Sequence, residues 1–225
     1  MPPTQEQAAA GQAVYTPRML RLYDLLVLAV SNRFIWKCPT VRLLQLYNDN
    51  VSNNHLDVGV GTGYYLDHCR FPSDRPRIAL LDINPNCLQA TAARIARYSP
   101  TCHEANIFEP LELNEAKFDS IGLNYVLHCL PGTMPEKLVA VKHLAELLLV
   151  PGGVLFGSTL LHGGVPRGWP ARRLMDFYNR KQIFSNAEDD LAMLEQGLAE
   201  TFDSCTIEVA GCAALFHGYR GVPGD

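Results

Sequence analysis

The apolar residues of this chain gather in short runs, and between the runs they recur at helical spacing. The runs have the length of β-strands and cover residues 54–58, 78–82, 101–104, 118–124 and 154–161. The helical patterns cover residues 16–30, 40–47, 64–70, 85–98 and 135–150. Strands and helices that alternate in this way predict a parallel sheet with right-handed crossovers.

The end of the chain follows a different pattern. Two helical stretches, 171–181 and 187–201, precede two strand-like segments, 204–210 and 213–219. Only two residues separate these last segments, whereas a parallel return needs a crossover of about a dozen residues. The pattern therefore predicts an α/β fold with a doubly wound, mostly parallel seven-stranded sheet, an antiparallel C-terminal hairpin, and helices on both faces.

Three glycines follow the first of these strands, in the segment NHLDVGVGTG. Gly59, Gly61 and Gly63 allow positive φ angles and let the backbone approach a ligand closely. Asp82 ends the next strand, where a carboxylate can accept hydrogen bonds from ribose hydroxyls. These features together predict a nucleotide-binding βαβ unit.

The kind of nucleotide is narrowed by what surrounds the glycines. A dinucleotide fingerprint needs a third glycine where this chain has Tyr64 or Leu66, depending on the register. No lysine follows the glycines, so the phosphate-binding loop of nucleoside triphosphatases is missing too. The remaining interpretation is a nucleoside ligand without a pyrophosphate.

Composition sets limits on the molecule as a whole. A chain of 225 residues with 48% hydrophobic residues can bury one substantial core, so we expect a single domain over residues 1–225. The net charge of −4 gives no general attraction for nucleic acid or an anionic membrane. A small-molecule partner is favoured, and monomer and homodimer stay open.

The cysteines and the N-terminal segment bear on location. Seven cysteines without a CxxC pair indicate reduced thiols and predict neither a disulfide framework nor a metal site. The N-terminal segment lacks a basic stretch followed by an apolar core, and no apolar stretch near it could span a bilayer. We expect a cytoplasmic protein.

Five segments in order resemble the motifs of class I S-adenosylmethionine-dependent methyltransferases, and the resemblance covers most of residues 15–219. The segments are LDVGVGTG at 56–63, LLDIN at 80–84, ANIFEP at 105–110, FDSIGLNYVLHCL at 118–130 and LLVPGGVLF at 148–156. The resemblance implies a Rossmann-like fold, S-adenosyl-L-methionine as cofactor, and methyl transfer to a small molecule, with secondary metabolism as one setting.

The resemblance also implies a cofactor site. It puts the three glycines beside the methionyl part, with Asp57 supporting their loop. Asp82 would bind the ribose hydroxyls and Ile83 would lie against the adenine, although Asp82 could instead cap the next helix.

Two further parts of that site come from later loops. Asn106 and Ile107 would contact the adenine, although an asparagine here also suits an ordinary turn. Asn124 and Tyr125 would face the sulfonium, with core packing as the alternative for Tyr125.

A catalytic base is needed only when the acceptor must lose a proton to become nucleophilic. His128 and His162 follow two strands at the same edge of the sheet and are the candidates. A loop histidine is more often a hydrogen-bonding or solvated residue, so the structural interpretation stays open beside the catalytic one.

Substrate recognition is expected outside the nucleotide unit. We divide the chain into a helical lid (1–50), a cofactor-binding core (51–161), a helical substrate segment (162–202) and the hairpin (203–219). Aromatic residues of the lid and the substrate segment are the candidate substrate contacts: Tyr15, Tyr23, Trp36, Trp169 and Tyr178. Packing of these rings onto the core is the alternative.

Two other functions fit the same fold. An enzyme could bind the cofactor and catalyse a cyclisation or rearrangement, in which case the product gains no methyl mass. A non-catalytic interaction protein could also use this fold, because fold does not determine reaction.

Overall fold

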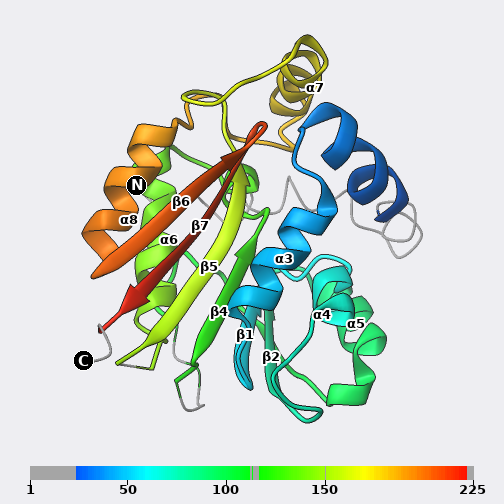
Figure 1. The fold of residues 1–225 in the computed structure, drawn as a ribbon, viewed down its shortest axis with the longest axis vertical. Helices are drawn as coiled ribbons and strands as arrows, with labels where there is room; N and C mark the ends of the chain where they lie inside the picture. Colours follow the sequence, from blue (N-terminus) through cyan, green and yellow to red (C-terminus); the bar gives the residue numbers. More distant parts are fainter. Residues whose placement is uncertain (1–23, 112, 114–116, 150, 222–225) are drawn as a thin grey trace.

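A computed structural model describes residues 24–111, 113, 117–149 and 151–221. Seven strands in these residues form one sheet in the order β3-β2-β1-β4-β5-β7-β6 (Figure 1). The strands are β1 (Asn54–Val58), β2 (Arg77–Asp82), β3 (Thr101–Glu104), β4 (Ser120–Asn124), β5 (Gly153–Leu160), β6 (Ser204–Ala210) and β7 (Ala213–Arg220). The first five are parallel, and β7 is antiparallel to both of its neighbours. The predicted fold class is confirmed.

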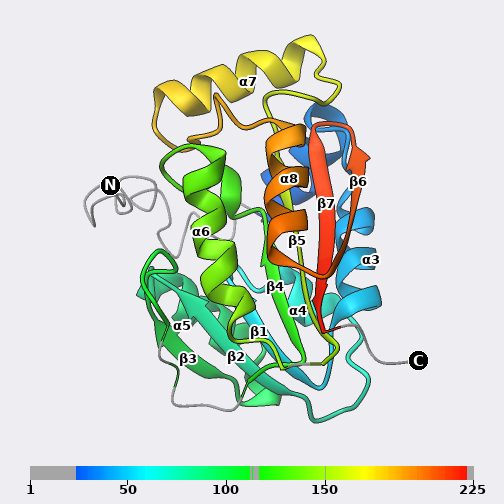
Figure 2. The same ribbon diagram turned by 90° about the vertical axis from the view of Figure 1, so that its left-hand side faces the viewer.

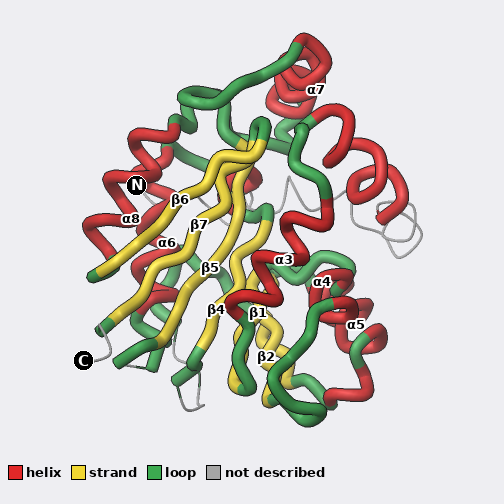
Figure 3. Tube along the Cα trace, in the orientation of Figure 1, coloured by secondary structure: helices red, strands yellow, loops and turns green. Residues whose placement is uncertain are grey.

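Helices cover both faces of the sheet. One face carries α6 (Met134–Ala145) and α8 (Leu191–Thr201), which lie side by side in front of the strands in Figure 2. The opposite face carries α3 (Thr40–Asn50), α4 (Tyr64–His68) and α5 (Pro85–Arg94). A third apolar cluster joins α7 (Trp169–Arg180) to the residues before α3, to the end of β5 and to the start of β7. Figure 3 shows α7 beyond this end of the sheet.

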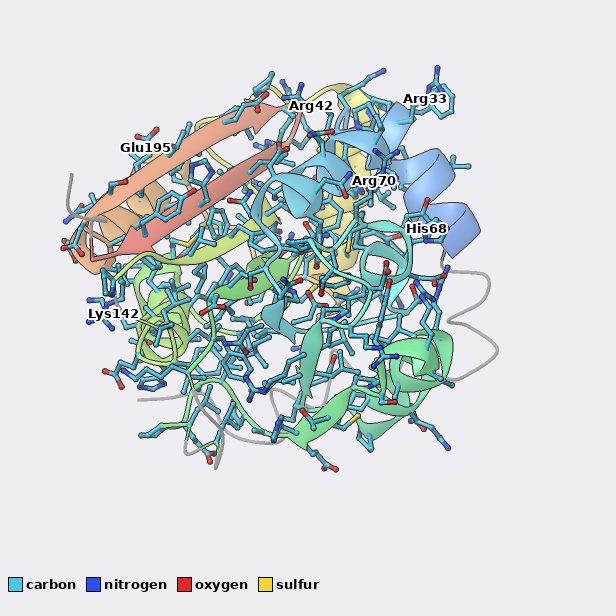
Figure 4. The ribbon with its side chains drawn as sticks, turned by 60° about the horizontal axis from the view of Figure 1, so that its bottom comes forward. Arg33, Arg42, His68, Arg70, Lys142 and Glu195 are labelled. Carbon is cyan, nitrogen blue, oxygen red and sulfur yellow. The ribbon has the colours of Figure 1, made fainter. Side chains whose placement is uncertain are left out.

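The central strands are buried on both faces because helices cover both. Every residue of β4 and β5 is buried, which explains their continuous apolar sequences. The edge strand β6 is half-buried or exposed along its whole length. Several charged side chains lie outside this core: those of Arg33, Lys142 and Glu195 project from the periphery in Figure 4.

The first described helix differs from the expected one. The apolar pattern predicts a helix over residues 16–30, whereas the structure has a helix of π type, η1, over Asp24–Ile35. The remainder of the predicted helix lies outside the described residues, as do Tyr15 and Tyr23.

Three predicted helices are too long. The helix expected over residues 85–98 ends at Arg94, and a separate 3₁₀ turn follows over Ala96–Tyr98. The helix expected to reach residue 150 ends at Ala145, because the backbone N–H of Leu149 donates to the carbonyl of Phe118 and joins the edge of the sheet. The helix expected from residue 187 begins at Leu191, because the Asp190 side chain accepts the N–H of Ala192 and caps it. No helix among the described residues has the length and apolar character that a membrane crossing requires.

Candidate functional site

A cavity of about 210 Å³ opens where the strand order reverses, between β1 and β4. It lies at the carboxyl ends of the parallel strands, which is where open α/β sheets bind ligands. Its wall comes from the β1–α4 loop, the end of β2, residues 105–108, the end of β4 and residues 129–131. Nine of the ten residues singled out in the sequence as cofactor contacts line the cavity, and the tenth, Gly63, belongs to the glycine loop without being among the lining residues.

The glycine loop turns sharply because all three glycines have positive φ angles, 66° at Gly59, 55° at Gly61 and 72° at Gly63. A Cβ on Gly59 would come within 2.4 Å of the Val126 side chain, so this glycine is required by packing. A Cβ on Gly61 would meet no atom within 4 Å. The space beside Gly61 therefore belongs to the cavity, and the bare backbone forms its floor.

Helix α5 braces this loop from outside. The hydroxyl of Thr91 donates to the carbonyl of Gly61 at 3.3 Å, and Arg94 donates to the carbonyl of Thr62 at 3.2 Å. Arg94 also donates to the carboxylate of Asp67 on α4, at 3.1 Å. These contacts fix the loop relative to two helices. Sequence reasoning missed them because they join residues about thirty positions apart.

The carboxylate of Asp82 faces the same loop. It accepts the backbone N–H of Asn84 at 2.8 Å, and the N–H groups of Gly61 and Val60 also point to it. Burial raises the pKa of this carboxyl to about 6, against the lowering effect of those hydrogen bonds. The cap of α5 is Asn84, whose side chain accepts the N–H of Asn86 at 3.0 Å. Asp82 is therefore not the helix cap.

The cavity has an apolar end beside Asp82. Ile83, Ile107 and Phe108 line it, and Phe108 is a residue that the sequence did not single out. Asn106 lines it too, and its side-chain oxygen accepts the N–H of Phe108 at 3.1 Å. Asn106 thus forms an ordinary turn and also lines the cavity. Its side-chain oxygen has a second lone pair, which can accept a further hydrogen bond while the turn is intact.

A buried polar cluster lies beneath the glycine loop. Tyr47 of α3 donates its hydroxyl to Asp57 at 2.8 Å, and the His55 ring lies 3.5 Å from the same carboxylate oxygen. The other ring nitrogen of His55 is 2.8 Å from the hydroxyl of Ser120 on β4. Tyr47 also stacks on Tyr65 at 5.1 Å, and both rings line the cavity. Helix α3 therefore contributes directly to the cavity wall.

Asn124 and Tyr125 close the cavity at the end of β4. The Asn124 side chain accepts a hydrogen bond from the Ser158 hydroxyl of β5. Tyr125 has a φ of 56°, in the left-handed region that aromatic residues seldom adopt, and its N–H donates to the carbonyl of Ser158 at 2.8 Å. A strained backbone at this position points to a functional constraint.

Comparison with known proteins identifies the family. A methyltransferase-domain family model matches residues 56–155. Demethylluteothin O-methyltransferase of Streptomyces thioluteus is 41% identical over 95% of this chain and 93% of its own length. The chain belongs to the class I S-adenosylmethionine-dependent methyltransferases. The physcion biosynthesis cluster O-methyltransferase of Aspergillus chevalieri is 34% identical, over 93% of this chain and 95% of its own.

Solved structures agree with this fold. The DhpI–SAH complex matches with a TM-score of 0.66 at 15% identity, over 98% of this chain and all of that one. An O-methyltransferase family protein from Burkholderia thailandensis matches with a TM-score of 0.63 at 20% identity, over 97% of this chain and 60% of that one.

The cavity of this methyltransferase fits S-adenosylmethionine. The bare backbone at Gly61 leaves room for close approach, and the Asp82 carboxylate suits two neighbouring hydroxyls. Ile83, Ile107 and Phe108 form an apolar end for a flat base. These features account for a nucleoside ligand that has no pyrophosphate.

The two histidines considered as bases do not line the cavity of the methyltransferase. His128 is buried, its Nδ1 accepts the N–H of Leu160 at 3.3 Å, and its ring packs edge-on against Phe184 at 4.5 Å. Burial lowers the pKa of His128 to about 3. His162 is partly buried after β5, and desolvation lowers its pKa as well. Their catalytic roles stay predictions, and the geometry favours a structural one for His128.

The described aromatic candidates also lie away from the cavity lining. Trp36 is 2% exposed and packs against Phe184 with ring centres 6.1 Å apart, and Tyr178 packs on the same ring at 4.9 Å. Trp169 begins α7 and is 71% exposed. Trp36 and Tyr178 thus join α7 to the N-terminal segment, which is the packing alternative. Their roles in substrate binding stay predictions.

Proposed function

We propose that this methyltransferase transfers a methyl group from S-adenosylmethionine to a hydroxyl oxygen of a small molecule of secondary metabolism. Two relatives support the oxygen acceptor, since both are named as O-methyltransferases and the chain matches each of them over more than nine-tenths of its length. The feature that carries the cofactor assignment is the cavity formed by Gly61 and Asp82.

The cofactor, when bound, supplies a methyl group activated by a positive sulfur. We assign its ribose to Asp82, its adenine to Ile83, Asn106 and Ile107, and its methionyl part to the glycine loop. Asp57 acts indirectly, because it is buried under the loop and holds Tyr47 in the wall. The sulfonium end is assigned to Asn124 and Tyr125.

The chain's own contribution to the reaction is alignment and exclusion of water. The lid of residues 1–50 and the helical segment 162–202 are proposed to hold the acceptor. The net charge of −4 favours a small acceptor over nucleic acid, and seven unpaired thiols fit the reducing cytoplasm. A homodimer is compatible with this arrangement.

Label transfer tests the proposed function. The purified protein is incubated with S-adenosylmethionine that carries a deuterated methyl group and with a panel of hydroxylated aromatic and enolic compounds. We expect a product that is heavier by one labelled methyl on oxygen, and we expect Asp82→Ala to abolish most of it. A product labelled on nitrogen, or one that is rearranged without label, would contradict the proposal.

A further inference from the structure

Three tyrosines contribute aromatic rings to the wall of the cavity. Tyr47 comes from α3, Tyr65 from α4, and Tyr125 directly follows β4. Tyr65 and Tyr125 pack against the apolar cluster around α7, whereas Ile107 belongs to the cluster around α6. Tyr65 and Tyr125 therefore lie toward the α7 side of the cavity, and the proposed adenine contacts lie toward the α6 side.

Tyr47 holds the ring of Tyr65 in place. The two rings stack with their centres 5.1 Å apart and their planes 12° from parallel. Tyr47 is almost fully buried and packs edge-on against Phe156, with ring centres 5.1 Å apart. Its hydroxyl donates to the Asp57 carboxylate at 2.8 Å, and a hydrogen bond to an anion makes a phenol ring richer in electrons. The stacked pair is thus a fixed, electron-rich part of the wall.

Two contacts fix the ring of Tyr125. It packs edge-on against His128, with ring centres 5.5 Å apart and planes 83° from parallel. Its side chain also shares a hydrogen bond with the buried thiol of Cys38, in the segment before α3. Burial raises the pKa of Cys38 to about 11, so the thiol keeps its proton at neutral pH. The wall therefore contains rings from separate elements whose positions are set by the protein itself.

We propose that Tyr65, supported by Tyr47, and Tyr125 bind the sulfonium of the cofactor and so add an affinity for S-adenosylmethionine that S-adenosylhomocysteine lacks. The inference rests on the proposed function and adds the residues that distinguish the methyl donor from its product. The face of an aromatic ring attracts a cation, and this attraction is larger where water is excluded.

The chemistry of the donor makes such an attraction selective. Methyl transfer turns the positive sulfonium into a neutral thioether. The donor and the product share the adenine, the ribose and the methionyl chain, so the proposed contacts with Asp82 and the glycine loop bind both. A group that responds to the charge on sulfur is needed to separate them. The attraction of the rings is lost when the methyl group leaves, which favours exchange of the product for a new donor.

The test compares the affinities for donor and product in ring variants. Isothermal titration calorimetry gives the dissociation constants of S-adenosylmethionine and S-adenosylhomocysteine for full-length wild type, Tyr65→Leu and Tyr65→Phe. We expect Tyr65→Leu to weaken S-adenosylmethionine about 2- to 30-fold more than S-adenosylhomocysteine, the range of a cation–π contact. Tyr65→Phe keeps a ring and should keep most of the difference. A loss of folded protein weakens both ligands equally, so it leaves the ratio unchanged.

Tyr64→Leu is the matched control. Tyr64 also lines the cavity, but the guanidinium of Arg94 lies 5.4 Å from its ring centre, and the ring stacks on His68 at 4.1 Å. A ring that already holds a cation should add little to sulfonium binding, so the ratio should stay at its wild-type value. Tyr125→Leu tests the second ring and should shift the ratio in the same direction as Tyr65→Leu.

The possible results separate this inference from the proposed function. Equal losses for both ligands in Tyr65→Leu and Tyr125→Leu would show that the rings only shape the cavity, and would overturn the inference. An equally large shift of the ratio in Tyr64→Leu would overturn it too. These titrations contain no acceptor, so a failure to methylate oxygen would contradict the proposed function alone. If the wild type binds neither ligand, the cofactor assignment fails and the inference falls with it.

Discussion

Among single residues, Asp82 is expected to contribute most to the proposed cofactor binding. Its carboxylate lies at the end of β2 and lines the cavity, where ribose hydroxyls would donate to it. We expect Asp82→Ala to weaken binding of S-adenosylhomocysteine by about 1–3 kcal/mol, the value of charge-assisted hydrogen bonds. Isothermal titration calorimetry measures this, with the exposed Asp74→Ala as control. Equal affinity of wild type and Asp82→Ala would remove Asp82 from the site.

The pH dependence of binding follows from the same carboxyl group. Burial raises its pKa from 3.8 to about 6, so the unliganded protein disfavours the ionised form that accepts hydroxyl donors. Affinity for S-adenosylhomocysteine should therefore increase as pH rises from about 5 to about 7 and then level off. Titrations across this range measure the effect. Asp82→Asn should bind weakly with no such change, and an equal pH dependence in that variant would point to another group.

Two glycines of one loop should respond differently to the same substitution. Gly61→Ala places a methyl group in the cavity, and the left-handed backbone costs about 1–2 kcal/mol of stability. Its affinity for the cofactor should fall about tenfold or more, as expected for an overfilled site. Gly59→Ala should lose more stability, because its Cβ meets Val126. Urea denaturation measures the loss of stability, and calorimetry measures the loss of affinity. Full cofactor affinity in Gly61→Ala would contradict the assignment of the glycine loop to the cofactor.

Among the elements, a buried ion pair joins α6 to the segment between α7 and α8. Lys137 of α6 donates to both carboxylate oxygens of Asp189, at 2.9 and 2.7 Å, and to the carbonyl of Ser185 at 2.6 Å. Both charged side chains are almost fully buried. The N–H of Ser185 in turn donates to the carbonyl of His128, at 2.8 Å. The pair therefore connects α6 to the loop beside the site.

Removal of one partner should be costly. Lys137→Met leaves the Asp189 carboxylate buried without its counter-charge, and we expect a loss of about 3–5 kcal/mol in the free energy of unfolding. The exposed Lys142→Met on the same helix is the matched control, with an expected change within about 0.5 kcal/mol. In the double variant Lys137→Met with Asp189→Leu, most of the loss should be recovered. Urea denaturation measures all three, and an unrecovered loss would show that the Ser185 contact dominates.

The elements also show what the sequence could and could not predict. The strands were predictable because strands covered on both faces read as apolar runs, and the hairpin because two residues leave no room for a crossover. The glycines and Asp82 could be found because their spacing along the chain is recognisable. The left-handed backbone of Tyr125 and the hydrogen bond from Arg94 to the carbonyl of Thr62 leave no pattern in the sequence, because both depend on tertiary contacts. The sequence around His128 does not indicate whether its side chain lies in the cavity or in the core.

In the molecule as a whole, the cavity lies where the strand order reverses, between β1 and β4. Three elements of one layer, α3, α4 and α5, reach the cavity or its loop through Tyr47, Tyr65 and Arg94. The sheet contributes the end of β4, and the loop before α6 contributes residues 129–131. A bound cofactor would therefore contact most of the parallel half of the sheet, and it should stabilise the domain as one unit.

This coupling predicts a selective thermal shift. A ligand that binds only the folded protein adds about 2.7 kcal/mol at one hundred times its dissociation constant. For a domain of this size that corresponds to about 5–10 °C in Tm. S-adenosylhomocysteine should produce this shift in differential scanning fluorimetry, whereas NAD⁺ should not, because Tyr64 stands where a dinucleotide loop needs its third glycine. A comparable shift with NAD⁺ would mean that the cavity accepts a pyrophosphate, and a shift retained in Asp82→Ala would mean that the adenine end dominates binding.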